Sequence, residues 1–456
     1  MKSINFKLVH AITRGFIGAA ICVLSANSFS ATDHAKPTHI IEVQASTREE
    51  RTAIADLGFN LDELRSDKVF IYGKAKDAEY IKSKGFQAKA HVFKPEWYQW
   101  TPSHGETFSV NGEAQKYHSY DEVNSILGAL VGRNPSIANV MTLGRTVENR
   151  NVPIVRISGK SPAEAESAKL PTVMFMGCHH AREHLSVETP LKFIEYLLAN
   201  YGKDENITRL LDTREIFIAP MVNPDGHVYD FREGGRGKMW RKNRRANSGG
   251  TFGVDLNRNY GFKWGTGGSS TTPSSDVYMG PTPFSEPETQ NVRDFVRSQK
   301  RMTTLLSFHT FSELVLYPWG HTYDDIGQNG LGTVEDHNVF KKMATQMAGW
   351  NGYTPQQASD LYIASGDTTD WAYGELGIYA FTFELTPTSL WEGGFYPEPS
   401  VIQPTFDANL KPMLYMLEYA DNPKRVLTDA LPPYLGKGNT PSNLGIPVAN
   451  FRDAQF

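Results

Sequence analysis

Five short, almost continuous apolar runs constrain the fold of this 456-residue chain most strongly. They lie at 152–158, 172–176, 215–219, 304–308 and 378–385. A strand that is apolar at nearly every position is buried on both faces, which is typical of a sheet covered by helices. The sequence therefore predicts an α/β fold, an α/β/α sandwich around a mixed, mostly parallel sheet.

Helical patterns separate these apolar runs. Ser119 and Glu122 have the spacing of a capping box, and apolar residues then recur at helical intervals. Ser285 and Glu288 have the same spacing and predict a second capped helix. Helices are expected at 120–134, 187–200, 286–299, 334–350 and 405–420.

The first 31 residues have the character of a secretory signal peptide. Lys2, Lys7 and Arg14 precede an apolar run at 16–26, and small residues follow it. The run is too short to span a bilayer comfortably. We therefore expect a secreted or periplasmic protein whose mature form does not associate with a membrane.

A small unit precedes the large domain. Within 37–95, a strand–helix pattern occurs twice and a third strand follows, and each helix ends at a Gly-Phe pair. The unit contains no cluster of residues that could perform chemistry, and 95–116 has no periodicity, which is typical of a linker. The predicted organisation is a signal peptide at 1–31, a small α+β unit at 32–110, a large α/β domain at 115–425 and a C-terminal tail at 426–456.

Composition excludes a basic nucleic-acid-binding protein and a protein built on a disulfide framework. The formal net charge is −4, so no basic field is present to recruit nucleic acid. The only cysteines are Cys22 and Cys178, and the first lies in the signal peptide, which excludes a disulfide framework. We expect Cys178 to be a small buried packing residue.

The most informative polar segment is 177–184, because it directly follows the apolar run 172–176. Ligand sites gather at the ends of strands in open α/β sheets. Zinc takes imidazole and carboxylate ligands, and a reactive zinc site keeps one position for water. The segment offers His180, Glu183 and His184.

Two zinc arrangements are compatible with this segment. In the inverted zincin pattern, His180 and His184 bind the metal and Glu183 is the base, which requires these residues to lie on a helix. In the second arrangement, His180 and Glu183 bind together with a distant histidine. Gly177 and the expected helix start near 187 favour a loop, and hence the second arrangement. A polar loop without metal is the third interpretation.

Two distant residues strengthen the metal interpretation. His309 ends the apolar run 304–308, where a partner ligand would stand. Glu384 lies within the apolar run 378–385, and a carboxylate in a buried strand is costly unless it is paired or lies near a metal.

The ordered motifs resemble those of the zinc carboxypeptidase family, of the carboxypeptidase A type, from about Tyr117 to Ala420. The matching segments are His180-Ala181-Arg182-Glu183, Asn223-Pro224-Asp225-Gly226, Trp240-Arg241-Lys242, Asp255-Leu256-Asn257-Arg258-Asn259, Ser307-Phe308-His309, Tyr362-Ile363-Ala364-Ser365-Gly366 and Phe381-Thr382-Phe383-Glu384-Leu385. His184 stands where the family typically has Trp, and we expect it either to perturb the metal or to face solvent.

The resemblance implies one Zn²⁺ per chain, bound by His180, Glu183 and His309. It implies Glu384 and Arg241 as catalytic residues, the first as base and the second as oxyanion stabiliser. The substrate-binding residues that it implies are Arg182, Asn257, Arg258, Tyr362, Asp367 and Thr369. Asp255 is expected to hydrogen-bond the far nitrogen of His180.

The implied function is hydrolysis of the C-terminal peptide bond of peptides and proteins with a free C-terminus. By the resemblance, Asp367 and Thr369, with Gly320 and Thr382, line the specificity pocket. They favour apolar or aromatic C-terminal residues and, through Asp367, basic ones. The small unit at 32–110 resembles the family's activation pro-segment, which an activating protease removes. The protein is expected to be a monomer.

Two alternatives stay open: a relative that acts on peptidoglycan peptides or another amide, and a zinc-binding module without activity. The joint presence of Glu384, Arg258, Arg241 and Tyr362 favours the enzyme over the inactive module.

Overall fold

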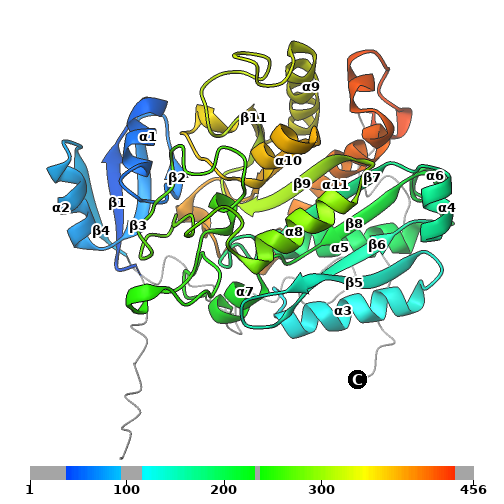
Figure 1. The fold of residues 1–456 in the computed structure, drawn as a ribbon, viewed down its shortest axis with the longest axis horizontal. Coiled ribbons are helices and arrows are strands. Elements are labelled where there is room, and N and C mark those ends of the chain that lie inside the picture. Colours follow the sequence, from blue (N-terminus) through cyan, green and yellow to red (C-terminus); the bar gives the residue numbers. More distant parts are fainter. Residues whose placement is uncertain (1–36, 94–115, 232–236, 437–456) are drawn as a thin grey trace, which may run out of the picture.

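The computed structural model describes residues 37–93, 116–231 and 237–436. The predicted signal peptide, most of the predicted linker and the end of the predicted tail lie outside the described residues. Two sheets organise the described chain, one in the N-terminal unit and one in the large domain (Figure 1). No helix in the described ranges has the length and apolar character needed to cross a membrane.

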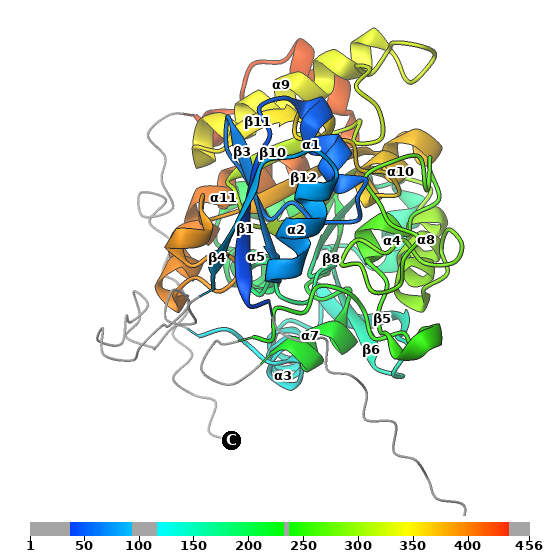
Figure 2. The same ribbon diagram turned by 90° about the vertical axis from the view of Figure 1, so that its left-hand side faces the viewer.

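The N-terminal unit is an antiparallel four-stranded sheet in the order β2-β3-β1-β4, with two helices packed on one face (Figure 2). Its elements are β1 (His39–Gln44), α1 (Arg48–Ala55), β2 (Glu63–Leu64), β3 (Lys68–Gly73), α2 (Ala75–Ser83) and β4 (Ala88–Val92). Ile41, Val69 and Ile71 face the helices, whereas Ile40 and Phe70 face loops of the large domain. The predicted small α+β unit is therefore present.

The large domain has an eight-stranded sheet in the order β11-β10-β12-β9-β7-β8-β6-β5. Its strands are β5 (Ala138–Arg145), β6 (Asn151–Ile157), β7 (Thr172–Gly177), β8 (Glu215–Ala219), β9 (Met302–Thr310), β10 (Leu314–Tyr317), β11 (Thr354–Gln357) and β12 (Tyr379–Leu385). The central strands β12, β9, β7 and β8 run parallel, and antiparallel pairs occur toward both edges. This confirms the mixed sheet.

Helices cover both faces of this sheet, because the central strands are apolar on both sides. One face packs against α3 (Tyr120–Arg133), α5 (Leu185–Asn200), α6 (Glu205–Thr213), α9 (Val334–Asn351) and α11 (Ile402–Glu418). The other packs against α8 (Pro287–Ser298) and α10 (Thr368–Leu376). Two short helices, α4 (Pro162–Ser167) and α7 (Pro224–Asp230), complete the set of α-helices within the described ranges. The α/β/α sandwich is confirmed.

One of the two predicted capping boxes is present. The Ser119 side chain accepts from the Glu122 backbone N–H at the start of α3. The prediction for α8 is wrong, because Pro287 occupies its first turn and makes Glu286 the N-cap. Ser285 Oγ donates instead to the Glu286 carboxylate.

The described part of the predicted tail packs on the domain. Short 3₁₀ turns at Pro423–Leu427 and Pro433–Leu435 follow α11. Val426 and Leu435 are buried in the larger hydrophobic core. Residues 426–436 are thus continuous with the domain core.

We predict that Phe175→Ala destabilises the protein by about 3–5 kcal/mol, because the change leaves a cavity in the core. Phe175 in β7 is fully buried and its ring meets Phe193 of α5 at 5.1 Å. Chemical denaturation of the full chain measures the free energy of unfolding. Val140→Ala on the edge strand β5, at an exposed position, is the control and should change stability little. Equal effects of the two changes would contradict the packing described for β7.

Candidate metal centre and substrate cleft

The metal-site loop leaves the sheet where β7 ends. Gly177 closes the strand, and a Cβ there would lie 1.9 Å from the Ser186 carbonyl oxygen, so only glycine allows this close approach. Residues 179–184 form bends and turns, and helix α5 begins at Leu185. The predicted loop is confirmed, and the helix that the inverted zincin pattern requires is absent from this described segment.

His180, Glu183 and His309 converge at the carboxyl ends of β7 and β9, and all three are buried. His180 Nδ1 lies 2.7 Å from Glu183 Oε1, and His309 Nδ1 lies 3.0 Å from Glu183 Oε2. The two Nδ1 atoms are 3.1 Å apart. One ligand atom from each residue lies within 4.8 Å of the others, which is a suitable grouping for one metal ion.

The outward nitrogens of both histidines show why the inward nitrogens suit a metal. His180 Nε2 donates to Asp255 Oδ1 at 3.0 Å, and His309 Nε2 lies 3.0 Å from Ser307 Oγ. A proton held on Nε2 leaves the lone pair on Nδ1 free for a cation. Two imidazoles and one carboxylate are a ligand set that zinc accepts, with a position left for water. The residues present therefore fit the ion.

His184 lies outside this cluster, so both expectations for it are wrong. It is buried, and its Nε2 donates to Asp230 Oδ2 at 2.9 Å. Asp230 Oδ1 also accepts from the backbone N–H groups of Lys238 and Trp240. His184 therefore neither faces solvent nor approaches the metal ligands, and it joins the loop before α5 to the segment that carries Arg241.

Asp255 connects the His–Glu–His cluster to the rest of the site. It is fully buried, and its Oδ1 accepts from His180 Nε2 and from the Asn257 backbone N–H. Its Oδ2 accepts from Arg241 Nε at 3.0 Å. Burial opposes its ionisation, but Arg241 and then His180 hold the pKa of Asp255 well below its usual range. The expected bond to His180 is present.

Glu384 lies beside the metal cluster on the neighbouring strand. In the parallel β12–β9 pair it stands opposite His309. Burial, followed by the charge of Glu183, raises the pKa of Glu384, while Arg241 and Arg258 oppose that rise. The carboxylate therefore lies next to the candidate metal position in an environment that favours proton uptake.

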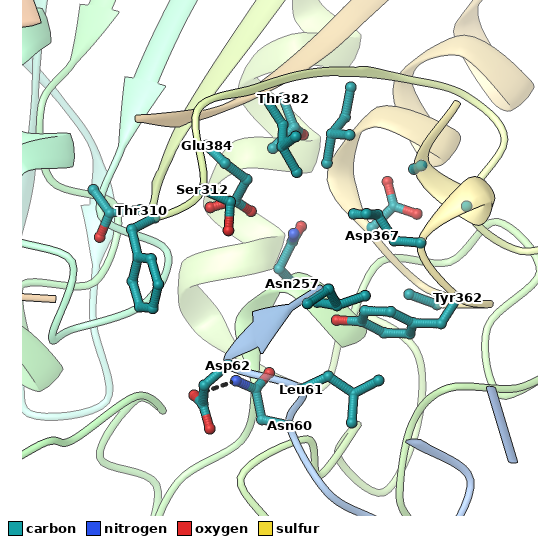
Figure 3. Close-up of a pocket in the computed structure, with 18 of the residues that line it drawn as sticks. Asn60, Leu61, Asp62, Asn257, Thr310, Ser312, Tyr362, Asp367, Thr382 and Glu384 are labelled. Atoms are coloured by element: carbon teal, nitrogen blue, oxygen red, sulfur yellow. Dashed lines mark hydrogen bonds between the residues drawn. The ribbon is translucent and has the colours of Figure 1, made fainter. Parts of the chain in front are cut away.

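These groups line a cavity of about 390 Å³ (Figure 3). Asn257 and Arg258 come from the loop after Asp255, and Tyr362 comes from the loop before α10. Arg258 is anchored by two bonds, from Nε to the Gly268 carbonyl and from Nη1 to the Asn257 carbonyl. The Tyr362 hydroxyl points into the cavity in Figure 3. Amide, guanidinium and phenol groups thus face one space beside Glu384.

Asp367, Thr369, Gly320 and Thr382 also line the cavity, as the resemblance implied. Asp367 caps α10, and its Oδ1 accepts from the Thr369 backbone and hydroxyl and from the Asp370 backbone. Burial, and then the charge of Asp370, raise the pKa of Asp367 to about 7. The pocket therefore holds a carboxyl group that can change its charge near neutral pH.

Arg182 contacts the N-terminal unit, a contact that the sequence did not indicate. Its Nη2 donates to Asp62 Oδ1 at 2.7 Å, and both side chains are buried. Asp276 lies 3.6 Å from Nη1, and the Phe395 ring lies 4.1 Å from the guanidinium carbon. Asp62 lies in the segment between α1 and β2, with no motif around it, so no local pattern could have identified it.

Further contacts join the two units around the cavity. Thr52 Oγ1 in α1 accepts from the backbone N–H of Ile363, next to Tyr362. Glu63 Oε2 accepts from the Leu390 backbone N–H at 2.7 Å. Asn60, Leu61 and Asp62 form part of the cavity wall in Figure 3. The N-terminal unit therefore covers one side of the cleft.

Comparisons with known proteins agree with this geometry. The family model described as zinc carboxypeptidase, peptidase M14, matches residues 123–411. A zinc carboxypeptidase of Saccharothrix mutabilis subsp. capreolus is 32% identical over 85% of this chain and 90% of its own length. Carboxypeptidase A2 of Rattus norvegicus is 33% identical over 69% of this chain and 72% of its own.

A solved structure shows the same fold over both units. Carboxypeptidase A from Helicoverpa armigera superposes with a TM-score of 0.70 at 24% identity, covering 85% of this chain and 98% of that chain. The match of the family model over most of the chain, joined with the His–Glu–His cluster, establishes the relationship. The chain belongs to the zinc carboxypeptidase family and is a metallocarboxypeptidase.

Proposed function

We propose that the protein is a secreted carboxypeptidase that removes the C-terminal residue of peptides and proteins, using one zinc ion held by His180, Glu183 and His309. The observation that carries the proposal is one cavity that combines this cluster with Glu384 and with an anion-binding group, Arg258. A metal site next to a carboxylate and an arginine suits a substrate whose scissile bond lies one residue from a free carboxylate.

Arg258 binds the terminal carboxylate of the substrate, because a guanidinium offers two parallel donors to a planar anion. Asn257 and the Tyr362 hydroxyl line the same space and add hydrogen bonds. Arg182, once released from Asp62, holds the substrate backbone upstream. These contacts place the last peptide bond beside Glu384.

Zinc, when bound, supplies a Lewis acid that polarises the scissile carbonyl and the attacking water. Glu384 takes the proton of that water and then passes it to the leaving amine. Arg241, oriented by Asp255, stabilises the negative charge that develops on the carbonyl oxygen. The chain thus supplies both a proton carrier and an oxyanion donor.

The side chain of the residue to be removed enters the pocket of Gly320, Thr369, Thr382 and Asp367. The small residues Gly320 and Thr369 leave room for large apolar or aromatic side chains. Asp367 adds a negative charge when ionised, which suits lysine and arginine and opposes acidic residues. The proposed preference is for apolar, aromatic and basic C-terminal residues.

The N-terminal unit acts as a pro-segment that an activating protease removes. The position of the unit supports this role. Asp62 accepts a hydrogen bond from the Arg182 guanidinium, and Asn60 and Leu61 line the cavity. Arg258, the proposed anchor of the substrate's terminal carboxylate, forms no ion pair with the described residues of the unit, and its hydrogen bonds go to the backbone carbonyls of Gly268 and Asn257. Latency should therefore affect long substrates more than short ones.

We predict that His309→Ala loses zinc while His184→Gln retains it, since only His309 belongs to the ligand cluster. Metal analysis after dialysis against a weak chelator gives the zinc content per chain. His184 is the matched control, because it is an equally buried histidine next to the ligand Glu183. The opposite result would restore the inverted zincin arrangement.

We predict that Glu384→Gln lowers kcat/KM by about 10²–10⁴, the range expected for loss of a general base, while zinc content and substrate binding persist. Rates are measured on blocked dipeptides ending in Phe, Leu, Arg and Glu. A chelator should abolish wild-type activity, and release of Glu should be the slowest. Near-normal turnover of the variant would remove Glu384 from the base role, and a wild type inactive on all four would contradict the proposed function.

We predict that Asp62→Ala raises the activity of the full-length chain on long peptides, because Arg182 is then free to bind the substrate backbone. Rates on a long peptide and on a blocked dipeptide are compared before and after proteolytic trimming. Asp67→Ala, an exposed aspartate of the same unit, is the control. Equal activity of full-length and trimmed wild type on the long peptide would make the unit a permanent accessory domain.

A further inference from the structure

The two oxygens of Asp367 have different environments. Oδ1 accepts three hydrogen bonds within the first turn of α10. Oδ2 is buried and has no hydrogen-bond partner among the described residues. A Cβ added to Gly320 would lie 3.1 Å from Oδ2, so this oxygen stands against the pocket wall. Oδ2 is thus the atom of Asp367 that remains available to a basic side chain in the pocket.

Ionisation of Asp367 is opposed by a second carboxyl group in the first turn of the same helix. Asp370 is fully buried one turn along the same helix. It raises the pKa of Asp367 together with burial, whereas Arg258 lowers that pKa. Tyr260 also faces Asp367, but it is a neutral phenol whose own pKa burial raises further. Repulsion between the two carboxylates disfavours a charge on Asp367, and it thereby limits how well the pocket binds a C-terminal lysine or arginine.

His321 is the side chain that offsets the charge of Asp370. Its Nδ1 donates to Asp370 Oδ2 at 2.7 Å, and its backbone N–H donates to the same oxygen. The Trp319 and Phe262 rings meet the imidazole edge-on at 5.2 and 5.4 Å. This aromatic enclosure holds the ring in place, so the bond to Asp370 is fixed behind the residues that line the pocket.

We propose that His321 is a specificity-determining residue that acts through Asp370: by hydrogen-bonding that carboxylate, it lets Asp367 carry the negative charge that admits C-terminal lysine and arginine at neutral pH. The proposal rests on the proposed function, since it concerns the pocket of the same site. His321 does not line the cavity, and it tunes the charge of the residue that does.

The proposal has a pH signature. The ratio of kcat/KM for Arg to kcat/KM for Phe should rise as Asp367 ionises, with a midpoint near neutral pH. Without the His321 donor, Asp370 repels that ionisation more strongly and the midpoint moves to higher pH. A shift of about one pH unit would lower the Arg/Phe ratio about tenfold below the midpoint. Release of Phe should stay within about twofold, because an apolar side chain does not use the charge.

The test compares three single variants with wild type, each secreted in full length, loaded with zinc and trimmed identically. His321→Phe removes the donor and keeps a ring. His321→Asn restores an N–H near the position of Nδ1 and should recover most of the Arg/Phe ratio. Asp367→Asn should flatten the pH dependence of the ratio, and adding His321→Phe to it should have no further effect.

Three results with the variants would overturn the proposal: an unchanged ratio and midpoint in His321→Phe, an effect of His321→Phe that persists in the Asp367→Asn background, or an equal loss of Phe and Arg release in both His321 variants. The last result would give His321 a structural role only. Wild-type protein that releases Phe but not Arg at any pH would refute this inference and leave the proposed function intact. Wild-type protein that releases neither residue would contradict both.

Discussion

The geometry of the site depends on one buried charge, that of Asp255. Its two oxygens orient His180 of the His–Glu–His cluster and the arginine that faces the cavity, Arg241, while the next turn of the chain presents Asn257. An ionised carboxylate so deeply buried is tolerated because it accepts hydrogen bonds on both oxygens. Breaking such a buried pair typically costs about 3–5 kcal/mol, so the three groups are held together rather than merely placed nearby.

The central sheet brings the residues of the site together at the cleft. His180 follows β7, His309 is the penultimate residue of β9 and Glu384 lies on β12, three strands that are adjacent and parallel. Because parallel strands present their carboxyl ends at one edge, residues far apart in sequence meet there without further devices. Figure 1 shows the N-terminal unit at that same end of the sheet.

Much of this could be predicted from the sequence, because buried central strands have an unmistakable apolar pattern and the motif residues follow them directly. Strands β2, β5, β10 and β11 were not predicted. Strands β2, β10 and β11 have only two to four residues, and β5 is an edge strand whose residues are mostly exposed, so none of them needs a long apolar run. The bonds from His184 to Asp230 and from Arg182 to Asp62 join distant segments. Such pairs follow from the final packing and leave no local signal.

The second face of the small sheet has a consequence for the trimmed enzyme. Ile40 and Phe70 cover Phe311, Leu390 and Phe395, all of them almost fully buried in the intact chain. Removal of the unit would uncover these apolar side chains beside the entrance to the cleft. Such a rim attracts unfolded polypeptide through the hydrophobic effect, whereas a chain end held in a folded domain has little apolar surface to offer. If the unit is removed as proposed, the trimmed protein would therefore bind other apolar surfaces more readily than the intact chain does.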